Sequence, residues 1–132
     1  MTRGWDRRRV GSTVLRGLLT AVFLVAAGMK FAAVPFEVDG FARFGYPLWF
    51  MYVVGALQLL GAVLLWTRRC VFLGAGLLAV IMVGAVGSHL LAGDPMLMPL
   101  PASVLLILLS GIAYARRAEL LPSGADAGMQ RV

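Results

Sequence analysis

Five side chains carry most of the chemistry that this sequence offers, and all of them lie in or beside long apolar runs. His89 can exchange a proton near neutral pH, and the Lys30 ammonium can stabilise an anion or oxyanion. Gln58 lies near the middle of an apolar run, while Glu37 and Asp94 lie in connections between runs. Polar groups in a membrane span are costly and therefore candidates for function. We predict His89 and Lys30 as catalytic residues, and all five as ligand-binding residues.

Three of these residues also have purely structural interpretations, which the sequence leaves open. Lys30 lies at the end of an apolar run, where a lysine can snorkel to the lipid headgroups. Gln58 can hydrogen-bond across a helix bundle and hold it together. His89 can be satisfied by a backbone carbonyl at the membrane interface.

Motifs for metals and cofactors are absent from the sequence. A single histidine and a single cysteine, Cys70, do not supply the paired ligands of zinc or haem, and one cysteine cannot form a disulfide within the chain. No glycine-rich phosphate loop, HExxH or GxSxG motif is present. We expect no metal site and no intrinsic cofactor, while His89 is able to hydrogen-bond the carbonyl of a bound quinone.

The composition indicates that the lipid bilayer is the main partner. Hydrophobic residues make up 61% of the 132 residues, charged residues only 14%, and the mean hydropathy is +0.89. Soluble domains are about 45–50% apolar and about 25% charged, so too few polar residues remain to cover an aqueous domain. Disorder is excluded because it needs low hydrophobicity. The net charge of +6 comes from short basic clusters between apolar runs, which are typical of topology signals and predict no nucleic-acid partner.

Four apolar runs, each near the length of about 20 residues that spans a membrane, predict four helices. They cover about residues 12–33, 48–66, 70–91 and 99–115, within one domain of residues 12–117. Residues 1–11 are predicted as a basic cytoplasmic segment and residues 118–132 as a mobile cytoplasmic tail. The first run is longer than the core of a signal peptide, so we expect it to stay uncleaved. The aromatic-rich residues 31–47 suit a short segment that lies in the membrane interface with its aromatic side down.

The basic residues also predict how the helices are oriented. Of the twelve lysines and arginines, all but Lys30 and Arg43 flank the same side of the predicted spans. By the positive-inside rule, both termini are then cytoplasmic. Short connections favour antiparallel neighbours, so we predict an all-α, integral membrane, antiparallel four-helix bundle, multi-pass in the cytoplasmic membrane. This arrangement puts Lys30 and His89 on the outer side with Gln58 deeper, which predicts a pocket with apolar walls and a polar mouth.

Helix packing leaves a pattern in the sequence as well. One face of the first run is expected to face the bundle, and it carries Arg16, Thr20, Phe23, Ala27 and Lys30. Small residues spaced four apart let helix backbones approach closely. Such pairs are Gly17 with Ala21, Ala75 with Ala79, and Gly84 with Ser88. Run 70–91 holds most of them, so we expect it to be the central element of the bundle.

Three stretches of the sequence together resemble a known family. They are LVAAGMKF at 24–31, FARFGYPLWFMYVVGALQLLGAVLLW at 41–66 and VGAVGSHL at 83–90. Their order and spacing resemble the DoxX-like family of small four-helix membrane proteins, from about Arg16 to Arg117. The sequence departs from the family at Gln58, where relatives often carry a glutamate. An amide cannot take part in the proton transfer that a buried acid can perform.

The resemblance implies a function that needs no intrinsic cofactor. Founding members of the family are linked to quinone-dependent oxidation systems, as the small membrane subunit beside an oxidising partner. We therefore expect a membrane subunit of a quinone-linked redox or oxidative-stress assembly, with a bound quinone and a protein partner or a homo-oligomer.

Two alternatives stay open beside this expectation. One is a stand-alone membrane enzyme that acts on a lipophilic small molecule, with His89 as acid and base and Lys30 as anion stabiliser. The other is a structural or chaperone-like membrane protein without a ligand. The sequence does not decide whether the protein is an enzyme.

Overall fold

The structure is a computed structural model that describes residues 2–120, and its described part is entirely helical, without a strand. The elements are α1 (Thr2–Phe31), α2 (Pro35–Arg43), α3 (Leu48–Leu64), α4 (Val71–Leu91), α5 (Leu100–Ala115) and the short 3-10 helix η1 (Arg117–Leu120). The all-α prediction is confirmed.

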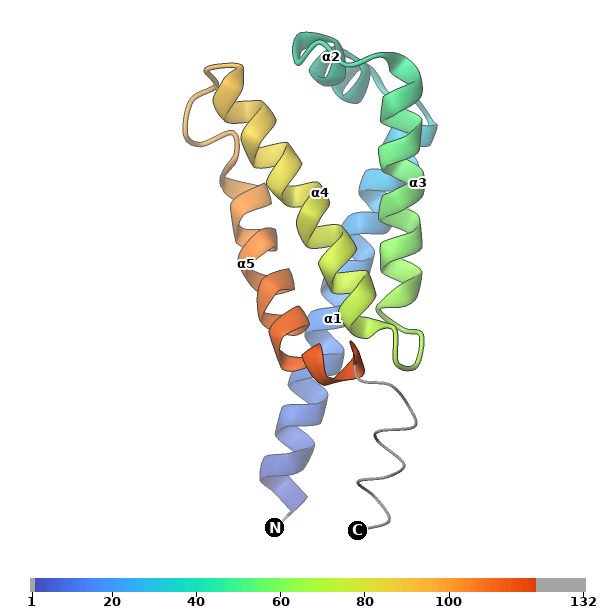
Figure 1. Cartoon of the computed structure of the whole chain (residues 1–132), viewed down its shortest axis with the longest axis vertical. Coiled ribbons are helices and arrows are strands. Elements are labelled where there is room, and N and C mark those ends of the chain that lie inside the picture. Colours follow the sequence, from blue (N-terminus) through green and yellow to red (C-terminus); the bar gives the residue numbers. More distant parts are fainter. Residues whose placement is uncertain (1, 121–132) are drawn as a thin grey trace.

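The four long helices run alternately up and down, so that consecutive ones are antiparallel (Figure 1). α3 packs against both α1 and α4, and α4 packs against both α3 and α5. The short α2 lies at the far end of the molecule from the N-terminus, beside the start of α3 (Figure 1). The central position expected for run 70–91 is thus shared between α4 and α3.

Two helices are long and apolar enough to cross a membrane, namely the part Val10–Phe31 of α1 and the whole of α4. α2 and α3 form a third candidate when taken together, with a bend of 114° between them. α5 is a shorter apolar helix of 16 residues. Length and composition therefore give two or three candidate spans within residues 2–120.

The apolar core fills the half of the molecule where α3 ends and α4 begins. Its buried members are Leu19, Phe23, Ala62, Leu65, Val71, Ala75, Leu78, Met82 and Leu109. Two glycines let α3 and α4 touch here: a Cβ on Gly74 would lie only 2.9 Å from the backbone oxygen of Gly61. Because the core occupies this half, the other half is free to hold a site.

Three turns at that other end share one local structure. Ala33, Gly45 and Gly93 each adopt a positive φ, and each is followed by one residue and then a proline. In the last of these turns the Gly93 amide donates to Leu90 O at 3.2 Å, and the Asp94 amide donates to His89 O at 3.0 Å. This pair of hydrogen bonds is a Schellman motif, which closes a helix C-terminus. The same pair of hydrogen bonds closes the other two turns. In each turn it fixes the direction of the residue that precedes the proline, namely Val34, Tyr46 or Asp94.

The ends of the chain differ from the predicted boundaries. α1 begins at Thr2, so residues 2–11 of the predicted basic segment 1–11 belong to the first helix instead of preceding it, as arginine is a good helix former. Within the predicted tail 118–132, residues 118–120 belong to η1, and residues 121–132 lie outside the described part. The interface segment 31–47 holds α2 and the turns around it.

Candidate functional site

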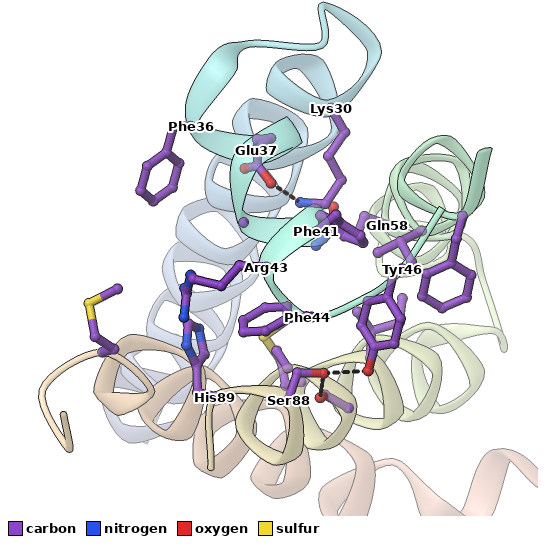
Figure 2. A pocket seen from close by; sticks show the side chains of 18 of the residues that line it. Lys30, Phe36, Glu37, Phe41, Arg43, Phe44, Tyr46, Gln58, Ser88 and His89 are labelled. Atoms are coloured by element: carbon purple, nitrogen blue, oxygen red, sulfur yellow. Dashed lines mark hydrogen bonds and ion pairs between the residues drawn. The ribbon is translucent and has the colours of Figure 1, made fainter. Parts of the chain in front are cut away.

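A cavity of about 900 Å³ lies between α2, α3 and α4, at the end of the molecule opposite the core. All five residues of the predicted site line this cavity. Figure 2 labels four of them, namely Lys30, Glu37, Gln58 and His89. Its polar lining residues are Lys30, Glu37, Asp39, Arg43, Tyr46, Gln58, Ser88, His89 and Asp94. Phenylalanine rings and aliphatic side chains form the remaining walls, and the exposed Phe36 and Met98 lie at the rim. The structure thus brings the predicted residues together, and their catalytic and binding roles stay predictions.

Lys30 and Glu37 form an ion pair at the α1 side of the cavity (Figure 2). Their charged atoms are 3.3 Å apart, and Lys30 is only 6% exposed. The ammonium also faces the ring of Phe41, with 5.8 Å from Nζ to the ring centroid. Gly55 on α3 leaves room for the lysine stem, since a Cβ there would lie 3.1 Å from Lys30 Cβ. Lys30 is therefore paired inside the protein in this structure and does not snorkel.

Gln58 is buried on α3, where it is 3% exposed and lines the cavity. Within residues 2–120, its Oε1 has no hydrogen-bond partner, although a cross-bundle hydrogen bond was one interpretation of the sequence. An unpaired buried acceptor costs about 1–3 kcal/mol, because it loses its water without replacement. The Gln58 amide oxygen is thus a buried acceptor without a partner among residues 2–120, on a residue that lines the cavity.

His89, Asp94 and Arg43 form a connected group at the α4 side of the cavity. His89 Nδ1 lies 2.6 Å from Asp94 Oδ2, and the Arg43 guanidinium binds the other carboxylate oxygen. The hydrogen bond from His89, together with the nearby Arg43, holds the pKa of Asp94 below its ordinary value of 3.8. An ionised carboxylate only accepts hydrogen bonds, so Nδ1 carries the proton. In the neutral imidazole this leaves Nε2 as an acceptor.

A second contact joins the α2–α3 turn to α4. Ser88 Oγ donates to Gly84 O at 2.8 Å, and Tyr46 OH lies 2.7 Å from the same Oγ (Figure 2). Because the serine proton is used in the first bond, Tyr46 is the donor in the second. Tyr46–Ser88 and Arg43–Asp94 together form a clasp that holds the α2 segment against α4.

The clasp residues Arg43, Tyr46 and Ser88 were not predicted as site residues. The sequence indicates Arg43 as one of two basic residues on the outer side, within the interface segment, and Ser88 as a small packing residue. The available signal was that all three lie in the stretches 41–66 and 83–90. Three aromatic side chains of the interface segment, Phe36, Phe41 and Phe44, line the cavity, and Phe36 is exposed.

The lowered pKa of Asp94 gives a pH prediction. A carboxylate whose pKa is lower in the folded protein stabilises it above its unfolded pKa and loses this effect as the pH falls. We expect Asp94→Asn to lower the melting temperature in detergent by a constant amount above pH 3.8, the ordinary aspartate value. The difference from wild type should shrink as the pH falls below that value. A difference that persists at the lowest pH contradicts the ionised contact with His89 and Arg43.

Comparison with known proteins places the chain in a family. The profile of the DoxX-like family matches residues 14–111. The uncharacterized protein YdgD of Bacillus subtilis (strain 168) is 35% identical over 102 residues, which cover 72% of this chain and 89% of that protein. No solved structure matches the chain. With its apolar helices and this extended family match, the chain is a membrane protein that belongs to the DoxX-like family.

Proposed function

We propose that this protein is the small membrane subunit of a quinone-linked redox or oxidative-stress assembly, and that it binds a quinone in the cavity. The observation that carries the proposal is the cavity itself. It has aromatic and aliphatic walls, a buried lysine at one side and a buried amide whose oxygen has no partner in the described part of the chain. Apolar walls with a few converging polar groups are the common design of sites for small lipophilic ligands.

The residues of the cavity fit a quinone head and tail. The Lys30 ammonium has three N–H donors, and it forms an ion pair with Glu37. Its other donors are able to bind a ring carbonyl as well. The rings of Phe41, Phe44 and Phe50 supply flat apolar surface for the head group. The exposed rim at Phe36 and Met98 leaves an exit for an isoprenoid tail. When bound, a quinone would supply the redox chemistry that the chain itself lacks.

The proposal includes an arrangement in the membrane. α1, α3, α4 and α5 cross the cytoplasmic membrane as an antiparallel four-helix bundle, with both termini in the cytoplasm. The uneven distribution of basic residues supports this orientation, because Lys30 and Arg43 are the only lysine and arginine residues of the described part, residues 2–120, that line the cavity. The cavity then lies in the outer half of the membrane, with α2 as an interfacial helix over it.

A stand-alone enzyme is the second candidate, and the His89–Asp94 pair favours it. A carboxylate that fixes the proton on Nδ1 leaves Nε2 ready to act as a general base, as in other histidine–carboxylate pairs. His89 would then exchange protons with a lipophilic substrate, and Lys30 would stabilise a developing anion. This candidate predicts that His89→Ala abolishes turnover of such a substrate while the protein stays folded.

Native mass spectrometry of the protein extracted in mild detergent tests the quinone proposal. We expect a retained quinone, alone or with a protein partner. Ala85→Phe should displace the quinone, because Ala85 lines the cavity, while Val83→Phe should retain it, because Val83 is exposed on the same helix. Quinone retained equally in both variants contradicts the site. A protein that carries only bulk phospholipid, even after addition of decylubiquinone, contradicts the proposed function.

A further inference from the structure

We propose that the buried end of the cavity binds an aromatic hydroxyl group, so that a phenol or hydroquinone binds more tightly than the matching molecule without a hydroxyl hydrogen. The inference rests on the proposed function, because it assumes that the cavity takes a lipophilic ring. It goes further by assigning the hydrogen-bonding character of the ligand. The argument depends on which donors and acceptors of the cavity are already used.

Four of the donor side chains that line the cavity already have a partner within the protein. Arg43 donates to Asp94, and Tyr46 donates to Ser88. The Ser88 hydroxyl donates to a backbone carbonyl, and the Nδ1 proton of His89 goes to Asp94. Lys30 keeps spare donors beside its bond to Glu37, and these can serve a hydroxyl oxygen as well as a carbonyl oxygen.

In contrast, one buried acceptor has no partner among residues 2–120, and a second acceptor is not used by the His89–Asp94 pair. Gln58 Oε1 is buried and without a hydrogen bond, and His89 Nε2 is the imidazole nitrogen that Asp94 does not bind. A hydroxyl group satisfies such an acceptor while its oxygen accepts from Lys30. A carbonyl or an ether oxygen brings no proton, so Gln58 Oε1 would stay buried and unpaired beside it.

The walls indicate that the hydroxyl is carried by an aromatic ring. Phe41, Tyr46 and Phe50 contact one another at the cavity, with centroid distances of 6.1 Å for Phe41–Tyr46 and 5.0 Å for Tyr46–Phe50. The rings of Phe44 and His89 meet edge to face, with 5.1 Å between their centroids. Aromatic side chains gain from offset and edge contacts with further rings. No free ionic charge is left over on the deep residues, because Lys30 is paired with Glu37, so a neutral ring fits better than an anion.

A matched ligand pair isolates the hydroxyl hydrogen. The purified full-length protein in lipid nanodiscs is titrated with 4-octylphenol and with 4-octylanisole, which keeps the ring and tail but replaces the hydroxyl by a methyl ether. We expect the phenol to bind about tenfold more tightly, since satisfying one buried acceptor corresponds to about that factor. For the same reason, decylubiquinol should bind more tightly than decylubiquinone.

Gln58→Met should remove most of this preference, because methionine keeps the length of the side chain without the amide oxygen. Val54→Leu is the matched control, since Val54 lies one turn away on α3 and lines the same cavity without a hydrogen bond. We expect it to keep the preference. Removal of an unpaired acceptor should leave the melting temperature unchanged or higher, and Gln58→Leu provides a second variant with the same expectation.

The outcomes separate this inference from the proposed function. Equal binding of phenol and ether, with quinone still bound, overturns the inference alone. Binding of neither the alkylphenol nor decylubiquinone overturns both. An unchanged preference in Gln58→Met and Gln58→Leu overturns the assignment to Gln58, and lower melting temperatures of both variants would show that its amide serves packing instead.

Discussion

Replacement of Gly74 by alanine is expected to destabilise the protein by about 1–3 kcal/mol, the usual cost of forcing an extra methyl group into a packed contact. The new Cβ would lie 2.8 Å from Leu64 Cβ and 2.9 Å from both Gly61 O and Leu65 N. Two of these three neighbours are backbone atoms, which cannot turn aside as the tip of a side chain can. The helices α3 and α4 would have to separate, and valine at the same position should cost more. Thermal unfolding in detergent measures the loss.

Gly76→Ala is the matched control on the same helix. A Cβ at Gly76 meets nothing within 4 Å, so alanine there should be neutral or should stabilise by up to about 1 kcal/mol through its better helix propensity. Gly61→Ala is a third variant whose stability can be compared with these two. Its Cβ would lie 2.5 Å from Cγ of Leu78, which is buried in the core. Equal stability of the Gly74 and Gly76 variants would mean that α3 and α4 do not cross at this point.

The same crossing shows what small-residue spacing could and could not predict. The spacing identified Ala75, which is fully buried in the core. It also suggested Gly17 and Gly84, where a Cβ would meet nothing within 4 Å. Spacing within one helix describes a face of that helix but does not say which helix lies opposite. In a chain with 16 glycines, the pair Gly61–Gly74 could be found only once the crossing of α3 and α4 was known.

The bundle-facing side of the first helix was predictable, because helical periodicity needs no knowledge of the partner. Of the face expected to point inward, Phe23, Ala27 and Lys30 are all buried. Arg16 and Thr20 turn toward the end of α3: Arg16 Nη1 donates to Leu65 O at 2.9 Å, and Trp66 Nε1 donates to Thr20 Oγ1 at 2.6 Å. The prediction holds over the described length of this face.

The gathering of the five candidate residues was predictable for a different reason. Alternating helices put the end of α1 and the end of α4 on the same side, and the connections around Glu37 and Asp94 follow those ends directly. The clasp was not predictable in this way. Tyr46 and Ser88 are 42 residues apart, and their contact depends on the turn that the positive φ of Gly45 makes possible. Side-chain contacts of this kind need the bend between α2 and α3, which periodicity does not specify.

Removal of the Lys30 charge is the second change with a large expected effect. Lys30→Met leaves the Glu37 carboxylate, which is only 14% exposed, without its cation. Loss of one partner of a buried ion pair costs about 3–5 kcal/mol, mainly because the remaining charge stays desolvated. We expect the free energy of unfolding to fall by an amount near the lower end of this range, about 3 kcal/mol, because the Glu37 side chain keeps some contact with solvent. Chemical unfolding in detergent, followed by circular dichroism, measures the free energy of unfolding.

The double variant Lys30→Met/Glu37→Gln decides whether the ion pair itself causes this loss. With both charges removed, no unpaired charge remains, so most of the lost stability should return, and the cycle of four proteins should give a large coupling energy. Arg43→Met is the comparison, because the Arg43 side chain is 44% exposed and its pair with Asp94 is screened by solvent. Arg43→Met should therefore lower the free energy of unfolding far less than Lys30→Met does. If the double variant is as unstable as the sum of the single ones, Lys30 and Glu37 act independently, and α2 is held over the cavity by the clasp and the aromatic contacts instead.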